Sequence, residues 1–498
     1  TDPALGSMKD LEQLAADCAD AGICLVADFI FNHTSDEHEW ALNAKAGDPA
    51  FQSYYWVFAD QGKTEEYQQH LRDIFPEVRR GSFTYVEEMG KWVWTSFHSY
   101  QWDLNYRNPE LFKAMTGEMM YLANRGISIL RLDAVAFIWK EAGTNCENRK
   151  EAHTIIQAFQ AAARLVAPSL LFKSEAIVHP DDILSYIDLR ECQLSYNPLL
   201  MAELWEAAAT KEVRLLAHSL AKRHSLPAGC SWINYVRCHD DIGWTFADED
   251  AAELGIHGAD HRNFLNSFYM GEFPGSFSRG VSFQHNPQTG DRRICGTAAS
   301  LAGIEQALEK GSTEDLERSV RRVLMLYGIA YAAGGIPLLY LGDEVGTLNR
   351  YEYADDPSQA SDSRWVHRPL WSDAAAEARY DTSNYVGKIF CGLKRMAEER
   401  KKHAVFSRQD LQIADSGHPS VLAFHKQMHK GNTHGLLTVL ANFSEATVYI
   451  SSDKAAELLS GQAASDLLSG NILLPGEGLE LVSCSLFWLY TEIPQFEQ

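Results

Sequence analysis

Three carboxylates stand just after short apolar, β-prone runs of the chain. They are Asp133, Glu175 and Asp240, and the runs before them cover residues 127–132, 170–173 and 232–236. Reactive side chains at the ends of strands, with helical stretches between them, are typical of a (β/α) barrel. Two carboxylates beside a glycosidic bond can supply a nucleophile and a general acid. The pattern therefore predicts glycosyl chemistry on a (β/α) barrel.

A cation and two imidazoles accompany these carboxylates. Arg131 lies two residues before Asp133, so both side chains project from one face of a strand and the guanidinium can hold the carboxylate ionised. His33 ends an earlier apolar run, and His239 directly precedes Asp240. At strand ends we expect these imidazoles to donate hydrogen bonds to a bound sugar ring. Seen alone, each histidine also fits a packed core residue and the arginine a structural ion pair.

Each carboxylate has an expected role. Asp133 is the candidate nucleophile. Glu175 is the candidate general acid and base, which requires a raised pKa in closed, apolar surroundings such as residues 170–172 would supply. A retaining reaction places the two carboxyl groups about 5–5.5 Å apart. Asp240 is expected to bind the ring hydroxyls, whereas Asp241 projects from the opposite strand face.

Four motifs, at residues 28–33, 131–135, 172–176 and 236–241, follow one another in a fixed order. This order resembles the α-amylase superfamily of retaining glycoside hydrolases and transglycosylases. Longer stretches, at residues 101–105, 172–180 and 237–250, resemble the amylosucrase family, and the resemblance covers essentially the whole chain. It implies an enzyme that takes the glucosyl group from sucrose, releases fructose and extends an α-1,4-glucan. Its partners would be sucrose and a glycogen or maltooligosaccharide acceptor.

The resemblance also implies further contacts to the substrate. It places three arginines on the acceptor side, namely Arg72, Arg262 and Arg293. Phe97 and Gln101 match neighbours of the sucrose pocket. Arg364 matches an arginine that closes the pocket behind the glucose, and its usual acidic partner belongs to a loop after strand two, which we do not find. Each arginine alone also fits a solvated surface salt bridge.

The composition argues against several classes of partner. The chain has 498 residues, 46% of them hydrophobic, and a net charge of −23. This charge argues against nucleic acid or an anionic membrane and favours a neutral substrate. The sequence has no apolar run of about 18 residues, no segment that resembles a signal peptide, and no paired cysteine spacing. We therefore expect a cytoplasmic protein with no cofactor and no obligatory metal.

The order of the runs predicts a barrel with additions. We expect the barrel domain at residues 1–403, interrupted by a domain B at 35–107 and a second excursion at 242–300. Alternating apolar positions and Gly-rich turns at 404–498 predict an antiparallel β-sandwich. Strand-like runs are found only for barrel strands three to eight. The expected fold is therefore an N-terminally incomplete (β/α)8 barrel of α-amylase type, without the family's helical N-terminal domain.

Three functions stay open at this point. The first choice is a sucrose-dependent glucosyltransferase. A sucrose hydrolase or isomerase of the same superfamily would share the three carboxylates and differ in the acceptor arginines and loops. An inactive fragment would act only as a carbohydrate-binding or structural protein, because missing strands can remove activity without any change in the catalytic residues.

Overall fold

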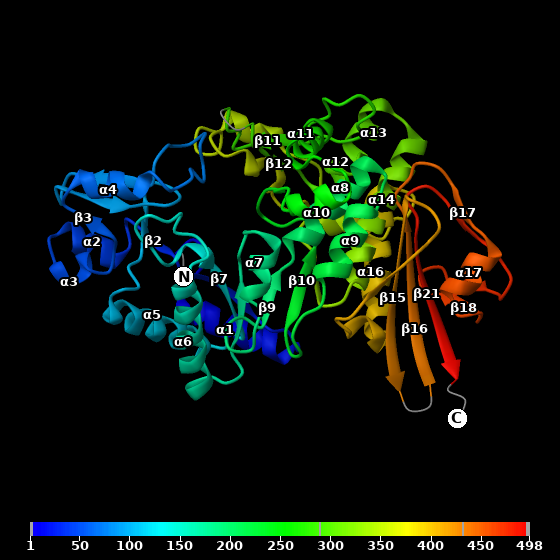
Figure 1. The fold of residues 1–498 in the computed structure, drawn as a ribbon, viewed down its shortest axis with the longest axis horizontal. Coiled ribbons are helices and arrows are strands. Elements are labelled where there is room, and N and C mark those ends of the chain that lie inside the picture. Colours follow the sequence, from blue (N-terminus) through cyan, green and yellow to red (C-terminus); the bar gives the residue numbers. More distant parts are fainter. Residues whose placement is uncertain (1–2, 288–289, 431–432, 495–498) are drawn as a thin grey trace. The chain divides into compact units, whose positions relative to one another are not determined.

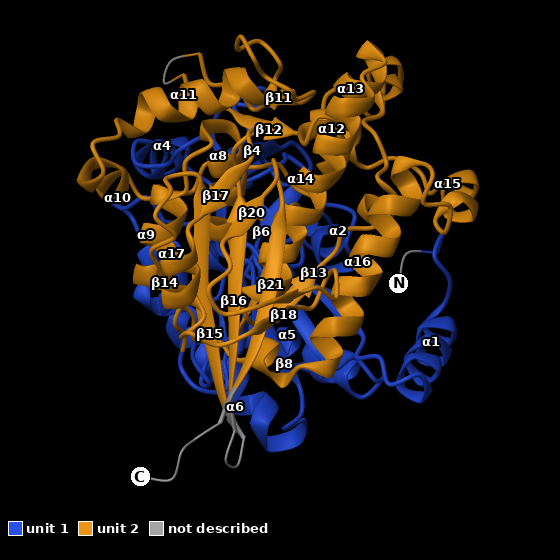
Figure 2. Ribbon diagram, turned by 90° about the vertical axis from the view of Figure 1, so that its right-hand side faces the viewer, with its two compact units in different colours: residues 1–196, 227–230 blue, residues 197–226, 231–498 orange. Residues whose placement is uncertain are grey.

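The computed structural model describes residues 3–287, 290–430 and 433–494 of the chain. The chain divides into two compact units, coloured separately in Figure 2. Unit 1 comprises residues 1–196 with 227–230, and unit 2 comprises residues 197–226 with 231–498. Both units combine parallel strands with helices (Figure 1). The domain boundaries expected from the sequence stay a prediction.

Unit 1 is built on a parallel sheet in the order β1-β7-β8-β9. Ile30 of β1 lies opposite Asp133 of β7, and Leu132 lies opposite Ser174 of β8, so the strands end at one edge of the sheet. The strands are β1 (Val26–Ile30), β2 (His33–Ser35), β3 (Val57–Phe58), β4 (Phe83–Val86), β5 (Lys91–Trp94), β6 (Gln101–Asp103), β7 (Ile129–Asp133), β8 (Leu171–Ser174) and β9 (Leu194–Tyr196). The helices are α1 (Met8–Asp20), α2 (Glu39–Lys45), α3 (Pro49–Gln52), α4 (Gln61–Gln68), α5 (Pro109–Ala123), α6 (Lys150–Val166) and α7 (Pro180–Ser185).

The core of unit 1 lies between its sheet and helices α5 and α6. Leu130 and Leu132 of β7 are fully buried together with Met119 of α5 and Phe159 of α6. Helix α5 begins as the sequence indicates, because the Asn108 side chain accepts a hydrogen bond from the backbone N–H of Glu110 and a proline occupies the first helical position. This packing holds the ends of β7 and β8 rigidly.

Residues 33–103 carry the antiparallel pair β2-β6 and the three-stranded sheet β3-β5-β4. Their core is aromatic, with Trp56, Tyr67 and Trp94 buried against one another. The short helices α2, α3 and α4 in this segment were not predicted, since the sequence there shows little helical period. Their N-caps, His38, Asp48 and Asp60, are local signals that a period search does not detect.

Unit 2 contains the parallel pair β10-β13, in which Ile233 lies opposite Ile336. Helix α8 beside it is buried over almost its whole length, and α14 packs against α16. Helix α14 begins at Thr313, where the Ser312 side chain caps it. The helices are α8 (Pro198–Thr210), α9 (Arg214–Arg223), α10 (Asp248–Glu253), α11 (Gly258–Tyr269), α12 (Ala298–Leu301), α13 (Ile304–Lys310), α14 (Thr313–Ala332), α15 (Asp373–Ala378), α16 (Tyr385–Lys402) and α17 (Ser452–Leu458).

The C-terminal part of unit 2 is an antiparallel sheet in the order β14-β15-β16-β21-β18-β19, with a separate β17-β20 pair. Its long strands β15, β16 and β21 run side by side in Figure 1. This confirms the predicted antiparallel C-terminal strands. The strands of unit 2 are β10 (Ser231–Tyr235), β11 (Val281–Phe283), β12 (Arg293–Cys295), β13 (Ile336–Leu338), β14 (Gln412–Ala414), β15 (Val421–Lys430), β16 (Thr433–Asn442), β17 (Val448–Ile450), β18 (Ala464–Asp466), β19 (Ile472–Leu473), β20 (Leu479–Leu481) and β21 (Leu486–Pro494).

In the part of the chain that the structure describes, no helix is both long enough and apolar enough to cross a membrane.

Candidate active site

Arg131 joins three carboxylates in unit 1. Its side chain is 7% exposed and donates to Asp28 at 2.8 Å, to Asp133 at 3.0 Å and to Glu175 at 2.5 Å. The register explains the cluster, because Asp28 on β1 lies directly opposite Arg131 on β7, and Glu175 follows β8 next to it. The structure thus brings together the predicted nucleophile, the predicted acid/base and their arginine. Asp28 lay in a quoted motif, but the sequence analysis gave it no role.

The charges of this cluster act on one another. Burial alone would lower the pKa of Arg131, and the negative charges of Glu175, Asp133 and Asp28 raise it above its ordinary value. Glu175 is 12% exposed, and Phe172 before it is fully buried. The sequence analysis expected apolar surroundings for Glu175 and missed the ion pair. This ion pair favours the ionised carboxylate, whereas a general acid must carry a proton.

His33, Gln101 and Phe97 form a second group in unit 1. The His33 Nε2 atom lies 2.8 Å from the Gln101 side-chain nitrogen, and the rings of His33 and Phe97 are 5.4 Å apart. Burial lowers the pKa of His33, aided by Lys140 and opposed by Asp103 and Asp133. His33 is therefore a neutral imidazole near pH 7. It brings no charge into the site, and its Nδ1 atom lies 3.4 Å from the Asn32 side-chain nitrogen, so both ring nitrogens face side-chain amides.

A buried ion pair supports this group and was missed by the sequence analysis. The Lys140 Nζ atom lies 2.6 Å from Asp103, and the two side chains are 1% and 0% exposed. Asp103 also accepts hydrogen bonds from Asn32 and from the backbone and hydroxyl of Ser96. Because β2 pairs with β6 so that His33 faces Asp103, the ion pair fixes the strand that carries the histidine. A lone lysine after an apolar run was the only sequence signal for it.

Arg72 is paired with an acidic residue of its own unit. It makes a bidentate ion pair with Glu147, at 2.6 and 3.0 Å, and its side chain is 61% exposed. Arg72 and Glu147 line a small cavity together with Trp94, Phe137 and Lys140. The geometry matches the surface ion pair that the sequence analysis kept as an alternative, so its acceptor role stays a prediction.

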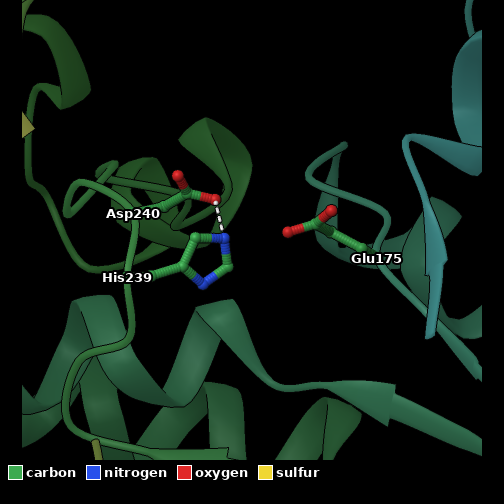
Figure 3. Close-up of side chains that lie close together, drawn as sticks. All are labelled: Glu175, His239 and Asp240. Carbon is green, nitrogen blue, oxygen red and sulfur yellow. Dashed lines mark ion pairs between the residues drawn. The ribbon is translucent and has the colours of Figure 1, made fainter. Parts of the chain in front are cut away.

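In unit 2 the predicted substrate-binding carboxylate is held by cations. The His239 ring lies 3.2 Å from Asp240, the dashed line in Figure 3. Arg364 donates to Asp240 at 3.1 Å, and Arg368 approaches it at 3.5 Å. Burial alone would raise the pKa of Asp240, but the His239 hydrogen bond and the two guanidinium groups hold it below its ordinary value. Asp240 is therefore ionised over the physiological range.

The acidic partner of Arg364 differs from the expected one. The resemblance implied a partner in a loop after strand two, but in the structure Asp362 accepts hydrogen bonds from Arg364 at 2.8 and 2.9 Å. The reason is local: both side chains lie on a short 3₁₀ turn that starts at Asp362, which also caps it. Asp362 was given no role in the sequence analysis.

The two remaining arginines lie in the segment between β10 and α12. Arg293 on β12 is 3.4 Å from Asp241, whose burial raises its pKa. Arg293 lies beside the Asp240 group, since its guanidinium and that of Arg364, which binds Asp240, are 5.1 and 5.0 Å from the same Phe283 ring. Arg262 instead binds Asp248 at 2.7 Å and two backbone carbonyl groups, so it stabilises its own loop.

One group of side chains in unit 2 has the atoms of a metal site. His218, Asp250 and Glu253 present nitrogen and oxygen atoms near one another. Asp250 already accepts from Lys222 at 2.6 Å and from Arg223. Two cations on the central carboxylate compensate its charge, so this cluster is an ion-pair network between α9 and α10 and a poor metal site.

The chain is similar to known proteins in sequence and in fold. Residues 1–219 match the family described as alpha amylase, catalytic domain. The trehalose synthase/amylase TreS of Mycolicibacterium smegmatis is 23% identical over 460 residues, which cover 87% of this chain and 70% of the relative. A sucrose 6F-phosphate phosphorylase from Thermoanaerobacter thermosaccharolyticum has a TM-score of 0.64 at 16% identity, covering 96% of this chain and 86% of its own. The isomaltulose synthase PalI from Klebsiella sp. LX3 has a TM-score of 0.66 at 15% identity, with 98% and 86% covered.

The likeness to the two solved structures shows the fold. It confirms the expected class, a barrel of the (β/α)8 type followed by an antiparallel C-terminal sheet. The residues matched by the family include β1, β7 and β8, which carry the Arg131 cluster. Residues 1–219 are therefore similar to the catalytic domain of alpha amylases, and this similar part includes the Arg131 cluster.

Proposed function

We propose that the protein is a retaining glucosyltransferase that uses sucrose as donor and an α-1,4-glucan as acceptor. The observation that carries the proposal is the Arg131 guanidinium, which contacts both Asp133 and Glu175. Two carboxylates on one guanidinium can flank one glycosidic bond, as a nucleophile and a general acid must, and the retaining course rests on the resemblance of the motifs.

The reaction proceeds in two displacements. Asp133 attacks the anomeric carbon of the glucosyl unit while Glu175 gives its proton to the fructosyl oxygen. The bond between that carbon and oxygen breaks, fructose leaves and a β-glucosyl-enzyme forms. Glu175, now ionised, takes the proton of an acceptor hydroxyl whose oxygen attacks the same carbon and releases Asp133. Sucrose and acceptor are converted into fructose and an acceptor longer by one glucose.

The Arg131 ion pair suits one half of this cycle. It stabilises the ionised Glu175 that acts as base in the second step. For the first step Glu175 must be protonated, and a protonated carboxyl group no longer forms this ion pair. Sugar binding therefore has to separate Glu175 from Arg131. His33, His239 and Asp240 take the ring hydroxyls in this proposal, with the ionised Asp240 favouring the positive charge that develops on the ring.

Different observations support sucrose as the donor and a glucan as the acceptor. The resemblance of the motifs favours sucrose, and one structural neighbour is named for a phosphorylated sucrose. The glucan acceptor rests on the resemblance and on Arg293, whose ion pair with Asp241 places a cation next to the Asp240 group. Arg262 and Arg72 would contribute from their own loops.

Isomerisation or hydrolysis is the second candidate. The curated relative is named a trehalose synthase/amylase and one structural neighbour an isomaltulose synthase, and both names specify disaccharide products or hydrolysis. In that case the glucosyl-enzyme would be attacked by the retained fructose or by water.

Product analysis separates these functions. The purified chain is incubated with sucrose, with and without glycogen, and fructose, glucose, isomeric disaccharides and insoluble glucan are followed together. Fructose in excess of glucose, with glucan appearing, supports the transferase. Equal fructose and glucose, or an isomeric disaccharide, would replace it by the second candidate. The folded variant Asp133→Asn is the control, and a wild type as inactive as this variant would refute the proposal.

A further inference from the structure

We propose that His367 is a positioning residue that sets the orientation of the His239–Asp240 segment through the His239 carbonyl group. This inference rests on the proposed function, because it assigns Asp240 and His239 to sugar binding. The sequence analysis gave His367 no role.

The hydrogen bonds of His367 define its tautomer. Its Nδ1 atom accepts a hydrogen bond from the backbone N–H of Gly296 at 3.1 Å. The proton must therefore be on Nε2, which lies 3.1 Å from the His239 carbonyl oxygen and donates to it. The side chain is 1% exposed, and burial, with help from Arg237, lowers the pKa of His367 to about 3. A neutral imidazole with this tautomer is the form that satisfies both neighbours.

A network of buried side chains fixes the backbone of His367. Arg237 donates to the His367 carbonyl oxygen at 3.2 Å and binds Asp343 through its Nε at 2.9 Å. Tyr327 donates to the second Asp343 oxygen at 2.6 Å. All of these side chains are buried, so the network is rigid and polar groups in it are expensive to leave unpaired. The imidazole is thus a fixed point against which the end of β10 is placed.

The 3₁₀ turn that carries His367 also binds the His239–Asp240 segment at a second point. Arg368 donates to the same His239 carbonyl oxygen at 2.8 Å, and Arg364 binds the Asp240 carboxylate at 3.1 Å. One short turn therefore holds both the backbone of His239 and the side chain of Asp240. Through Gly296, His367 also ties this segment to the strand end that carries Arg293.

A packed core histidine with no effect on the site is the competing explanation, and two substitutions separate the two. In His367→Gln the amide N–H can replace Nε2 and keep the bond to His239. In His367→Asn the amide oxygen can replace Nδ1 and keep only the bond to Gly296. We expect kcat for sucrose consumption to fall about tenfold in the Asn variant and to stay within about threefold of wild type in the Gln variant, because the site tolerates little displacement.

His224 provides a matched control. It is another buried histidine of unit 2, and its Nε2 lies 2.7 Å from the Ala333 carbonyl oxygen, away from the segment at issue. The His224→Asn variant is expected to lose stability but to keep kcat per folded molecule. Rates are therefore compared after the folded fraction of each variant has been measured by thermal unfolding.

A readout without turnover keeps the inference testable if sucrose is not the substrate. In protein labelled with ¹⁵N-histidine, the His367 ring should show the Nε2-protonated tautomer. The His239 ring signals should shift in His367→Asn and stay near wild type in His367→Gln. Equal kcat in the Asn and Gln variants, or unshifted His239 signals in the Asn variant, would overturn the inference. A wild type that leaves sucrose intact but shows these spectra would refute only the proposed function.

Discussion

Replacement of Lys140 by methionine should destabilise unit 1 strongly. Lys140 and Asp103 are 1% and 0% exposed and 2.6 Å apart, so the substitution leaves a buried carboxylate without its cation. Loss of one partner of such a pair costs about 3–5 kcal/mol. Three donors remain on Asp103, one from Asn32 and two from Ser96, and they partly compensate the charge. We therefore expect a loss of about 3 kcal/mol in the free energy of unfolding.

Urea unfolding followed by tryptophan fluorescence measures this loss, because the Lys140 Nζ atom lies 4.9 Å from the Trp94 ring. The control is Lys150→Met, whose side chain is 87% exposed and whose pair with Glu151 is 3.8 Å long, so its change should stay below about 0.5 kcal/mol. The double variant Asp103→Asn/Lys140→Met should recover part of the loss, since no charge is left unpaired. A Lys140→Met variant within about 1 kcal/mol of wild type, with an unchanged urea slope, would refute the reasoning.

Three further results are expected. Glu175→Gln should lower kcat on sucrose by about 10²–10⁴-fold but affect the first-turnover burst of fluoride from α-glucosyl fluoride much less, because fluoride leaves without a proton; an equal loss of this burst would contradict the acid role. Arg293→Ala should lower the ratio of glucan to free glucose about two- to fivefold, whereas Arg279→Ala, which breaks a pair with Glu309 at 2.7 Å in the same segment, should leave the ratio unchanged. Burial lowers the pKa of His224 from 6.5 to about 4, so the unfolded chain binds more protons than the folded one between these two pH values. The free energy of unfolding should therefore fall as the pH drops through this window. At about 1.4 kcal/mol per pKa unit, the loss reaches up to about 3 kcal/mol. Acid titration of the urea midpoint checks the last result, and His224→Gln should flatten the curve; an equally steep curve in that variant would assign the effect to other groups.

Much of the Arg131 cluster was predictable from local pattern. Asp133 follows an apolar run, and Arg131 two residues earlier shares its strand face, so their 3.0 Å contact follows from the period of a strand. The contact of Arg131 with Glu175 needs in addition that β7 and β8 be neighbours in parallel register. The repeated pattern of strand and helix predicts such neighbours.

The supports of the site were beyond sequence reasoning. His367 was not singled out because its two hydrogen bonds reach Gly296 and His239, both far away in the chain. The partner of Arg364 was sought in another loop, although Asp362 stood two residues away, because a family pattern was followed in place of the local turn.

The sequence by itself determined the candidate carboxylates at the strand ends, the parallel barrel class and the antiparallel C-terminal sheet. These follow from short-range periodicity and from side chains next to one another on a strand. Only the tertiary structure decided which cations neutralise Asp103, Asp240 and Asp241, and which arginines are engaged elsewhere. The physical reason is that burial makes an unpaired charge costly, and the partner that relieves this cost is chosen by distance in space.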